Sequence, residues 1–377
     1  MKELVIRQKK IDLNLAFLKK DLVFTISLTL AVMSCFIHQP KWEYIHFNVL
    51  VSLFNLMLAI KALEDLKLLD KLAVAILNKC YNVRLLSAIL ILMSFFTSMF
   101  VTNDVALITF VPLTLIISQK TQLNMIETII LQTIAANIGS SLTPMGNPQN
   151  LFIFSYYGIK PVQFLTTVLL MAVVGISALT FVIYRFKSNS IRMDLPLVRI
   201  VNRKKSSVWV LVFGLIVASI LGVISTQLAF IITMFTTCCL DKKLLIKIDY
   251  LLLVTFICFF IFIGNLSSID IVRTFVSEHI KDKTSVFFGS ILLSQLISNV
   301  PASIFLSKFT ADWQPLLLGV NLGGLGTIIA SMASVISYKL FIQENPSKSK
   351  IYLVKFSIYN FSFLAFLTIV QYIVLKL

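Results

Sequence analysis

Long apolar runs separated by short basic segments make up most of the chain. The clearest runs cover residues 22–37, 47–60, 164–184, 208–224 and 352–375. Each approaches or reaches the ~20 residues that an α-helix needs to cross a bilayer, and about nine to ten such passes fit in the sequence. Because lipid cannot pair with free backbone groups, the pattern predicts an all-α polytopic membrane protein.

The composition supports this class and argues against nucleic-acid binding. Of the 377 residues, 58% are hydrophobic and 13% are charged, whereas soluble proteins average about 45–50% and 25%. A net charge of +16 would suggest nucleic acid in a soluble protein, but here the basic residues lie between the apolar runs. We interpret the charge as a topology signal and expect the lipid bilayer, not nucleic acid, as a partner.

The positions of lysine and arginine predict the orientation, because cytoplasmic segments of membrane proteins are enriched in both. With the N-terminus in the cytoplasm, all but seven of the 33 basic residues fall on the cytoplasmic side. The exceptions are Lys41, Lys160, Arg273, Lys281, Lys283, Lys308 and Lys376. The first membrane helix is expected to begin at Leu22, with a cleaved signal peptide as the alternative. The expected location is the plasma or inner membrane of the cell.

This charge distribution requires two segments that enter and leave the membrane on the same face. Residues 84–119, interrupted at 97–104, are predicted to form a re-entrant hairpin that opens to the cytoplasm. Residues 284–311, interrupted at 298–301, are predicted to form a second hairpin that opens to the outside. Non-helical backbone at membrane depth is tolerated only where protein or a water-filled cavity satisfies its amides. Each interruption therefore points to an internal site.

A discontinuous helix is predicted after each hairpin, over residues 125–158 and 314–339. The first contains prolines and glycines in an apolar span, and the second has four glycines in the eight residues 319–326. Four positions correspond when the two are aligned: Asn137 with Asn321, Gly139 with Gly323, Thr143 with Thr327, and Asn147 with Ser331. By the distribution of charge, the first hairpin opens to the cytoplasm and the second to the outside, so the two halves have opposite orientations in the membrane. We therefore predict two inverted repeats, 1–195 and 196–377. Such repeats are typical of secondary transporters, whose binding sites lie at the helix breaks.

The tip of the first hairpin is Thr102-Asn103-Asp104. The Asp104 carboxylate is the only one that we place at membrane depth. An ionisable residue there costs about 2.5–3.5 kcal/mol on insertion scales, which favours a functional role. Capping of the helix that begins at Val105 is the structural alternative, and both roles are compatible. In the second hairpin Val300 takes the place of Asp104. The two tips are therefore not chemically equal, and the acidic one suits Na⁺ or a proton.

The breaks offer oxygen atoms to a cation and half-helix N-termini to an anion. We place a candidate Na⁺ site near Asn103, Asp104, Thr143 and Asn147. The alternative is that these small polar residues only allow helices to approach closely.

At these motifs the sequence resembles the ion transporter superfamily, and within it the citrate-transporter-like and arsenite-permease groups. The motifs are VTNDVALITFVP, ANIGSSLTPMGNPQNL and SNVPASIFLSKFT...GVNLGGLGTIIASMAS, and the resemblance covers about residues 48–377. It implies two inverted repeats, often in a homodimer, that move substrate between hairpin tips and helix breaks in an elevator-like manner. The sodium-coupled dicarboxylate branch has serine-asparagine-threonine at both tips, whereas TND here looks more like the arsenite and sodium/proton branches.

Together, the patterns and the resemblance give one candidate binding set at the tips and breaks. It comprises Thr102, Asn103, Asp104, Asn137, Gly139, Thr143, Asn147, Ser298, Asn299, Asn321, Gly323 and Thr327. We expect a secondary active transporter of a small anion, di- or tricarboxylate-like or arsenite-like, coupled to Na⁺ or H⁺. The sequence is compatible with uptake and with efflux.

Two alternatives belong to other classes of function. A Na⁺/H⁺ antiporter would use Asp104 to exchange cations and would move no anion. A channel or a membrane-embedded enzyme is also conceivable, because a fold alone does not fix a function. An enzyme would need a catalytic pair, and Asp104 stands alone. We expect no enzyme and no cofactor besides the coupling ion, since the chain contains no GxxxxGK[ST] motif.

Overall fold

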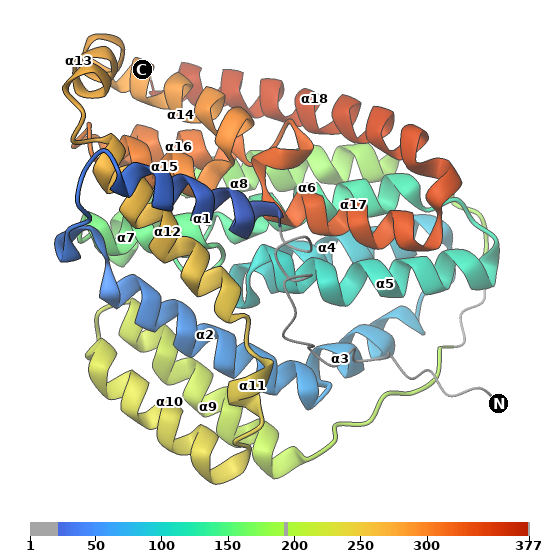
Figure 1. Cartoon of the computed structure of the whole chain (residues 1–377). Helices are drawn as coiled ribbons and strands as arrows, with labels where there is room; N and C mark the ends of the chain where they lie inside the picture. The colour runs from blue at the N-terminus through green and yellow to red at the C-terminus, as the bar shows by residue number, and fades with distance from the viewer. Residues whose placement is uncertain (1–21, 192–194, 376–377) are drawn as a thin grey trace.

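The computed structural model describes residues 22–191 and 195–375, and these ranges are almost entirely helical (Figure 1). Within them the only pairing of β type is an isolated bridge between Asn82 and Ser190. The predicted all-α class is confirmed. The six basic residues before Leu22, Arg192 and the C-terminal Lys376 lie outside the described residues. The predicted side of the membrane stays a prediction for every basic residue.

The helices of the first half precede the basic segment that follows Tyr184. They are α1 (Leu22–Cys35), η2 (Trp42–Tyr44), α2 (Phe47–Asp65), α3 (Leu68–Leu77), α4 (Val83–Val101), α5 (Asn103–Thr121), α6 (Ile126–Ser140), α7 (Pro148–Tyr156) and α8 (Pro161–Tyr184).

The helices of the second half begin at Arg203. They are α9 (Arg203–Ile220), α10 (Thr226–Leu240), α11 (Leu244–Lys247), α12 (Tyr250–Leu266), α13 (Asp270–His279), α14 (Lys283–Ile297), α15 (Asn299–Leu306), α16 (Trp313–Gly323), η3 (Ile328–Ala330), α17 (Met332–Glu344), η4 (Pro346–Lys348) and α18 (Ser349–Leu375).

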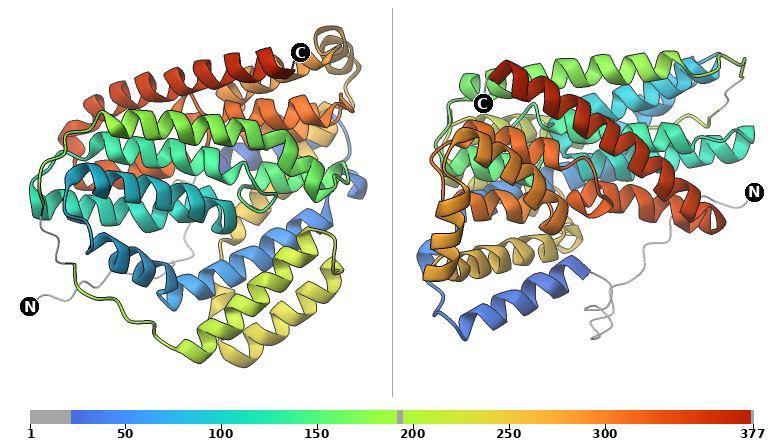
Figure 2. Two further views of the ribbon diagram at one scale, coloured as in Figure 1. Left: turned by 180° about the vertical axis from the view of Figure 1, so that it is seen from behind. Right: turned by 90° about the horizontal axis from the view of Figure 1, so that it is seen from above.

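The helices form two groups. Helices α9 and α10 pack on α2, and these three lie apart from the larger bundle of α4–α8 and α14–α18 (Figures 1 and 2). Helix α12 packs against α1, and it contacts both α2 and α15. The large bundle holds the two predicted hairpins and both discontinuous helices, so the candidate residues gather in this group.

Length and apolarity identify several helices that can cross a membrane. Among the described residues, α2, α4, α5, α8 and the stretch that contains α18 meet both criteria. Helices α12 and α13 make a sixth span if this pair, bent by 90°, is counted as one. Large apolar side chains such as Leu211, Ile231 and Phe235 are exposed on α9 and α10, as lipid-facing residues are. The multi-pass class is confirmed, while the count of nine to ten passes stays a prediction.

Each predicted hairpin consists of two helices joined through a single residue. Thr102 joins α4 to α5 with φ 79° and ψ 152°, and Ser298 joins α14 to α15 with φ 76° and ψ 154°. Non-glycine residues rarely adopt this region, at a cost of about 1–3 kcal/mol. Both predicted interruptions, 97–104 and 298–301, are too long, because α4 stays helical to Val101 and α15 begins at Asn299. In an apolar medium the helix keeps every amide paired up to the turn.

The arms of the first hairpin are longer than a re-entrant segment needs. Helices α4 and α5 have 19 residues each, or about 28 Å at 1.5 Å per residue. Length alone therefore also allows both arms to cross the membrane, and re-entry stays a prediction.

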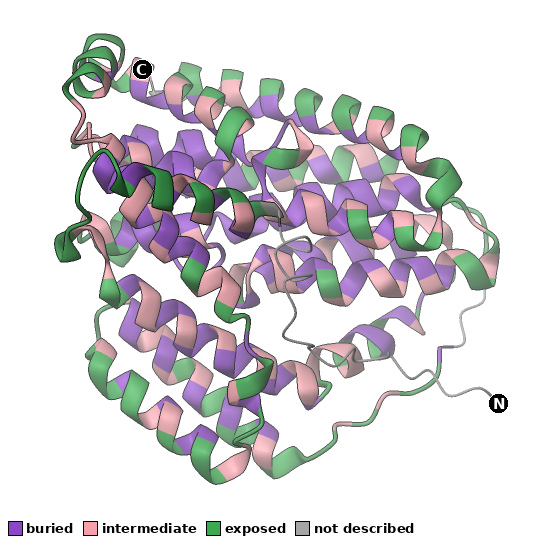
Figure 3. Ribbon diagram, in the orientation of Figure 1, coloured by how far each residue is buried: buried purple, intermediate pink, exposed green. Residues whose placement is uncertain are grey.

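Both discontinuous helices start with a deeply buried segment (Figure 3). Every residue of α6 except Glu127 is buried, and so is α16 from Pro315 to Gly323. A helix that is apolar and buried on all sides belongs to the core of a bundle. The first break, residues 141–147, is buried apart from the half-buried Thr143, and the second, residues 324–331, is mostly buried but exposes Ile329.

Two glycines let the hairpins pack closely against these buried helices. A Cβ atom on Gly139 would lie 2.1 Å from the Phe95 carbonyl oxygen in α4, and one on Gly323 would lie 2.6 Å from the Ser294 side chain in α14. Small residues allow helix backbones to approach in this way within membranes.

We expect Gly139→Ala to destabilise the protein by about 1–3 kcal/mol, the usual cost of overpacking. Gly323→Ala should cost less, because a serine side chain yields more easily than the carbonyl that faces Gly139. Thermal unfolding followed by size-exclusion chromatography of heated samples measures both. Gly214→Ala in α9 is the matched control, since a Cβ there meets nothing within 4 Å. Equal melting of the Gly139 and Gly214 variants would contradict the packing argument.

Candidate functional site

The tip of the first hairpin is bonded to the first helix break. The Asn103 backbone N–H donates to the Gly146 carbonyl oxygen at 3.1 Å, and Asn103 Nδ2 donates to Asn137 Oδ1 at 3.0 Å. Asn103 Oδ1 accepts the Asp104 N–H at 3.0 Å. The Thr143 hydroxyl of the break donates to the Met99 carbonyl of α4. Tip and break therefore form one unit.

The first break is closed by two asparagines at the start of α7. Asn147 caps this helix, since its Oδ1 accepts the Asn150 N–H at 3.1 Å. Asn150 Nδ2 lies 3.2 Å from each of the carbonyl oxygens of Ser140, Ser141 and Thr143. The last carbonyls of a helix have no partner within it. Asn150 supplies that partner at the end of α6.

The second break is held by its hairpin. Gln295 Nε2 in α14 donates to the carbonyls of Gly323 at 2.7 Å and Leu325 at 2.9 Å. Gln295 Oε1 accepts the Thr327 N–H at 2.8 Å, and the Thr327 hydroxyl donates to the Gln295 carbonyl at 3.3 Å. At the tip, Ser298 Oγ donates to the Ala330 carbonyl at 3.2 Å. One glutamine side chain thus satisfies three backbone groups of the break.

Buried side chains connect the two breaks to each other. Asn137 Nδ2 donates to the Gly324 carbonyl at 3.3 Å, and Asn137 Oδ1 accepts from Ser331 Oγ at 3.1 Å. Three asparagines form a second connection through two bonds: Asn147 Nδ2 to Asn321 Oδ1 at 3.2 Å, and Asn321 Nδ2 to Asn150 Oδ1 at 2.7 Å. All four asparagines are buried. Residues from the predicted first and second halves therefore share one polar network.

The structure brings most of the candidate set together. Asn103, Asn137, Thr143, Asn147 and Asn321 belong to this network. Ser298 and Thr327 bond within the second hairpin and break, and Thr102 forms the first turn. The amide of Asn299 lies beside Gly324, where a Cβ would approach its Nδ2 to 2.9 Å.

The two glycines of the set, like Asn137 and Asn321, lie in helical and not in unwound backbone. Gly139 is in the last turn of α6 and Gly323 is the last residue of α16. Both face hairpin helices, so their place in the structure is explained by close packing.

Asp104 lies at the edge of the network. It is half-buried and lies in the first turn of α5. Of the candidate Na⁺ ligands, Asn103 Oδ1 and Asn147 Oδ1 already accept backbone N–H groups. A cation here would share these oxygens or use the Asp104 carboxylate and carbonyls of the break.

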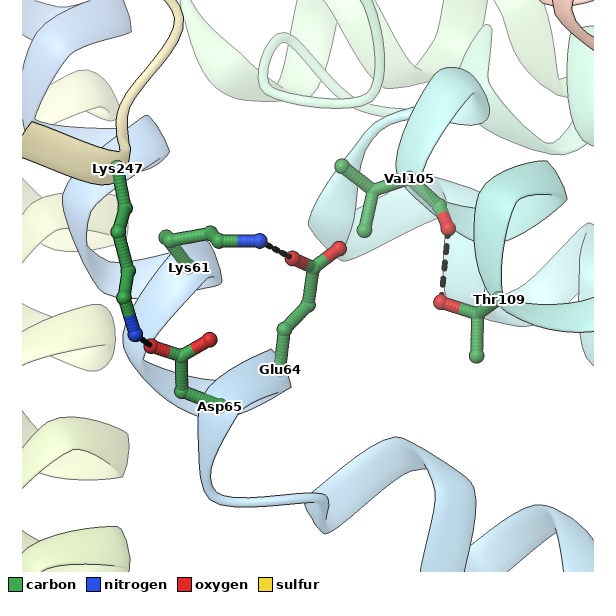
Figure 4. Close-up of polar contacts among 6 residues, drawn as sticks. All are labelled: Lys61, Glu64, Asp65, Val105, Thr109 and Lys247. Carbon is green, nitrogen blue, oxygen red and sulfur yellow. Dashed lines mark hydrogen bonds and ion pairs between the residues drawn. The ribbon is translucent and has the colours of Figure 1, made fainter. Parts of the chain in front are cut away.

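Two ion pairs lie at the end of α2, and Glu64 of one of them faces the start of α5 (Figure 4). Lys61 Nζ pairs with Glu64 at 2.9 Å in α2, and Lys247 Nζ of α11 pairs with Asp65 at 2.6 Å. The Glu64 carboxylate extends toward Val105 in the first turns of α5. All four charged side chains are 22–32% exposed. The acidic tip is therefore close to a partly exposed region with charges of both signs.

Three residues of the network are missing from the predicted set: Asn150, Gln295 and Ser331. Asn150 is three positions after the helix cap, a spacing that places it on the capped turn. Ser331 was matched to Asn147 by sequence and caps α17 at the equivalent place, but without a side-chain cap bond. No sequence signal pointed to Gln295, which is four residues before the tip asparagine of the second hairpin. The corresponding residue of the first hairpin is the apolar Met99.

Sequence comparisons relate the chain to three proteins, two of them named as transporters and one as an inner membrane protein. The chain is 34% identical over 320 residues to the uncharacterized transporter MJ0456 of Methanocaldococcus jannaschii, which covers 84% of this chain and 87% of the relative. It is 27% identical over 303 residues to the inner membrane protein YbiR of Escherichia coli, covering 78% and 80%. It is 26% identical over 140 residues to the putative transporter arsB of Dictyostelium discoideum, covering 37% and 25%.

A family model described as citrate transporter matches residues 4–323. This range includes both hairpins, the first discontinuous helix and the second as far as Gly323. The resemblance stated from the motifs is thereby confirmed, and with it the expectation of a transporter rather than an enzyme. The chain belongs to the citrate transporter family, and it is a multi-pass membrane transporter.

Proposed function

We propose that this transporter moves a small anion by secondary active transport, coupled to Na⁺ or H⁺. The observation that carries the proposal is the meeting of four helix N-termini at the shared polar network. Helices α5 and α15 begin at the tip asparagines Asn103 and Asn299, and α7 and α17 begin after Asn147 and Ser331. Each N-terminus carries the equivalent of about half a positive charge. Such ends bind anions through free backbone N–H groups.

The chemistry of the network favours an anion that accepts hydrogen bonds. Asparagine amides, serine and threonine hydroxyls and backbone groups make up this network, so helix dipoles and amide donors would balance the charge of the anion. The family description and the name of the Dictyostelium relative support a di- or tricarboxylate-like or an arsenite-like substrate. The proposed partners are this anion, the bilayer and the coupling ion.

We assign the coupling ion to Asp104. This carboxylate lies in the first turn of α5, between Asn103 of the network and Val105, toward which the Glu64 carboxylate of α2 extends. Val300 replaces it in the second hairpin, so one proton or Na⁺ site per chain is proposed. This half-buried carboxylate also supports a second candidate function, a Na⁺/H⁺ antiporter. In that case Asp104 exchanges cations and no anion moves.

Corresponding contacts support two repeats, residues 1–195 and 196–377. Thr143 bonds to the carbonyl four residues before the first tip asparagine, and Thr327 bonds to the carbonyl four residues before the second. Both tips also share one backbone conformation. The inverted orientation, the cytoplasmic N-terminus and the location in the cell membrane are proposed from the distribution of basic residues.

We also propose a homodimer, as the family resemblance implies. The exposed apolar side chains of α9 and α10, among them Leu211, Ile231 and Phe235, form a surface that a second copy could cover. Light scattering in detergent should then give twice the 42.5 kDa mass of the chain.

Replacement of Asp104 by Asn should uncouple transport. Uptake of labelled citrate or arsenite into proteoliposomes is expected to lose its dependence on the imposed Na⁺ or pH gradient, by about 5- to 150-fold, the usual range of coupling between linked sites. Asp270→Asn, an exposed carboxylate at the start of α13, is the control. Gradient-driven uptake at the wild-type level in the Asp104 variant would refute the assignment. Proton flux on adding Na⁺ without any anion would favour the antiporter instead.

Gln295→Met should weaken the second break and reduce transport. The substitution leaves the Gly323 and Leu325 carbonyls and the Thr327 N–H without their partner, at a cost of about 1–3 kcal/mol for buried polar groups. Thermal unfolding and uptake measure the two effects. Gln163→Met, at an exposed position of α8, should change neither. A Gln295 variant with wild-type melting and uptake would show that the break needs no such support.

Cysteine labelling tests the opposite orientation of the hairpins. In a background with the exposed Cys35, Cys238 and Cys239 replaced by Ser, Lys281→Cys should react with an impermeant maleimide added to intact cells. Lys120→Cys should react only after permeabilisation, because it lies at the predicted cytoplasmic end of the first hairpin. Both lysines are exposed. Labelling of both from the same side would exclude inverted repeats.

A further inference from the structure

A polar cavity of about 340 Å³ lies at the end of the large bundle, away from the candidate transport site. It opens where α4 and α6 begin, beside the start of the segment that joins α8 to α9 and the first turns of α18. Residues of its lining that bear on a ligand are Ser87, Glu127, Thr128, Arg185, Lys187 and Lys355. Nothing in the proposed transport uses this cavity.

The lining has an excess of positive charge. Lys355 pairs with Glu127, which leaves Arg185 and Lys187 without an ion pair to any described residue. The Arg185 guanidinium stacks over the Phe181 ring at 4.9 Å. Two cations that share one cavity repel each other, and an anion between them removes that repulsion.

The cations are held in place by the segment that carries them. Arg84 Nε donates to the Phe186 carbonyl at 2.8 Å, and the Val83 N–H donates to the Asn189 carbonyl at 3.0 Å. These bonds fix residues 185–189 against the start of α4. The backbone that carries Arg185 and Lys187 is therefore held at the cavity, while the two side chains themselves are exposed.

Helix ends and hydroxyl groups complete a site suited to phosphate. Helices α4 and α6 both begin at the cavity, and their positive ends favour an anion. Ser87 and Thr128 share a hydrogen bond at 2.9 Å, so one of the two hydroxyls keeps its O–H free to donate to a ligand oxygen. Arginine recognises phosphate through two parallel hydrogen bonds.

The surroundings of the cavity match the membrane surface. Phe181 and Tyr184, at the end of the apolar helix α8, are 60% and 71% exposed, and the Arg84 guanidinium lies over the Tyr184 ring at 5.1 Å. Aromatic and basic residues gather in this way at the level of lipid headgroups. Basic pockets between helices on the cytoplasmic side bind anionic headgroups.

From these observations we propose that this cavity binds a phosphate group, carried by an anionic phospholipid or by free phosphate. The group would bridge Arg185 and Lys187 of the connecting segment to Lys355 of α18. It would thereby tie the connection between the halves to the helices that lead into the first hairpin and the first break.

The test uses the purified full-length protein and reads binding, so it does not depend on the transported substrate. Thermal stabilisation and native mass spectrometry are measured with phosphatidylglycerol, with zwitterionic phosphatidylcholine and with inorganic phosphate. We expect phosphatidylglycerol to bind, and the double variant Arg185→Gln with Lys187→Gln to bind about tenfold more weakly or worse. Lys242→Gln with Lys243→Gln removes the same charge from the loop before α11 and should bind like the wild type.

Each outcome decides the proposal. Stabilisation by phosphatidylglycerol alone supports a lipid headgroup, and stabilisation or competition by inorganic phosphate supports free phosphate. The proposal is overturned if neither ligand binds, if phosphatidylcholine binds equally well, or if the control variant loses as much affinity as the cavity variant. If the double variant does not fold, the single variant Lys187→Gln, at an exposed position, gives the same readout.

Discussion

The need to satisfy backbone groups inside an apolar bundle is the constraint on which the structure depends. Each discontinuous helix frees carbonyl and N–H groups where no water is at hand in lipid, and each unpaired group would cost several kcal/mol. At the first break the Asn150 side-chain amide hydrogen-bonds to three backbone carbonyls. At the second break the Gln295 side chain donates to two backbone carbonyls and accepts from one N–H. The breaks persist because these amides are present. Half-helix N-termini are thus available at the centre of the protein.

The amide side chain that satisfies the backbone belongs to the discontinuous helix at the first break and to the hairpin at the second. The two halves are therefore mechanically unequal. Asn150 belongs to the discontinuous helix itself, so the first break is closed internally and its hairpin is attached by Asn103 and Thr143. Gln295 belongs to the hairpin, so the second break cannot move away from α14 without losing all three bonds. A displacement of the second hairpin would carry its break along, whereas the first hairpin can separate from a break that remains closed.

The positions of the tips and breaks could be predicted from local sequence signals. Contacts between residues far apart in the sequence could not. Glycines, prolines and runs of polar residues disturb a helix where they stand, so the positions of both tips and both breaks follow from sequence. The extent of the first interruption was wrong, because residues 97–101 resemble loop residues only by type and stay helical in an apolar bundle. Gln295 could not be found, since its three partners lie 28 to 32 positions further along the chain.

The distribution of charge links the fold to the proposed transport. The network at the centre is neutral, because a buried charge must be compensated at high cost, while ion pairs such as Lys61–Glu64 stay at its partly exposed edge. In the proposed transport, an anion that enters the network loses its hydrating water and gains hydrogen bonds to amide donors and helix ends. These groups carry no full charge, so they would bind the anion moderately and allow its release. In the proposed transport the half-buried Asp104, next to Asn103 of the network, would take up a cation when the anion binds and offset its charge. Because Val300 holds the corresponding position in the second hairpin, the proposal needs only one acidic tip, and a second would repel the anion.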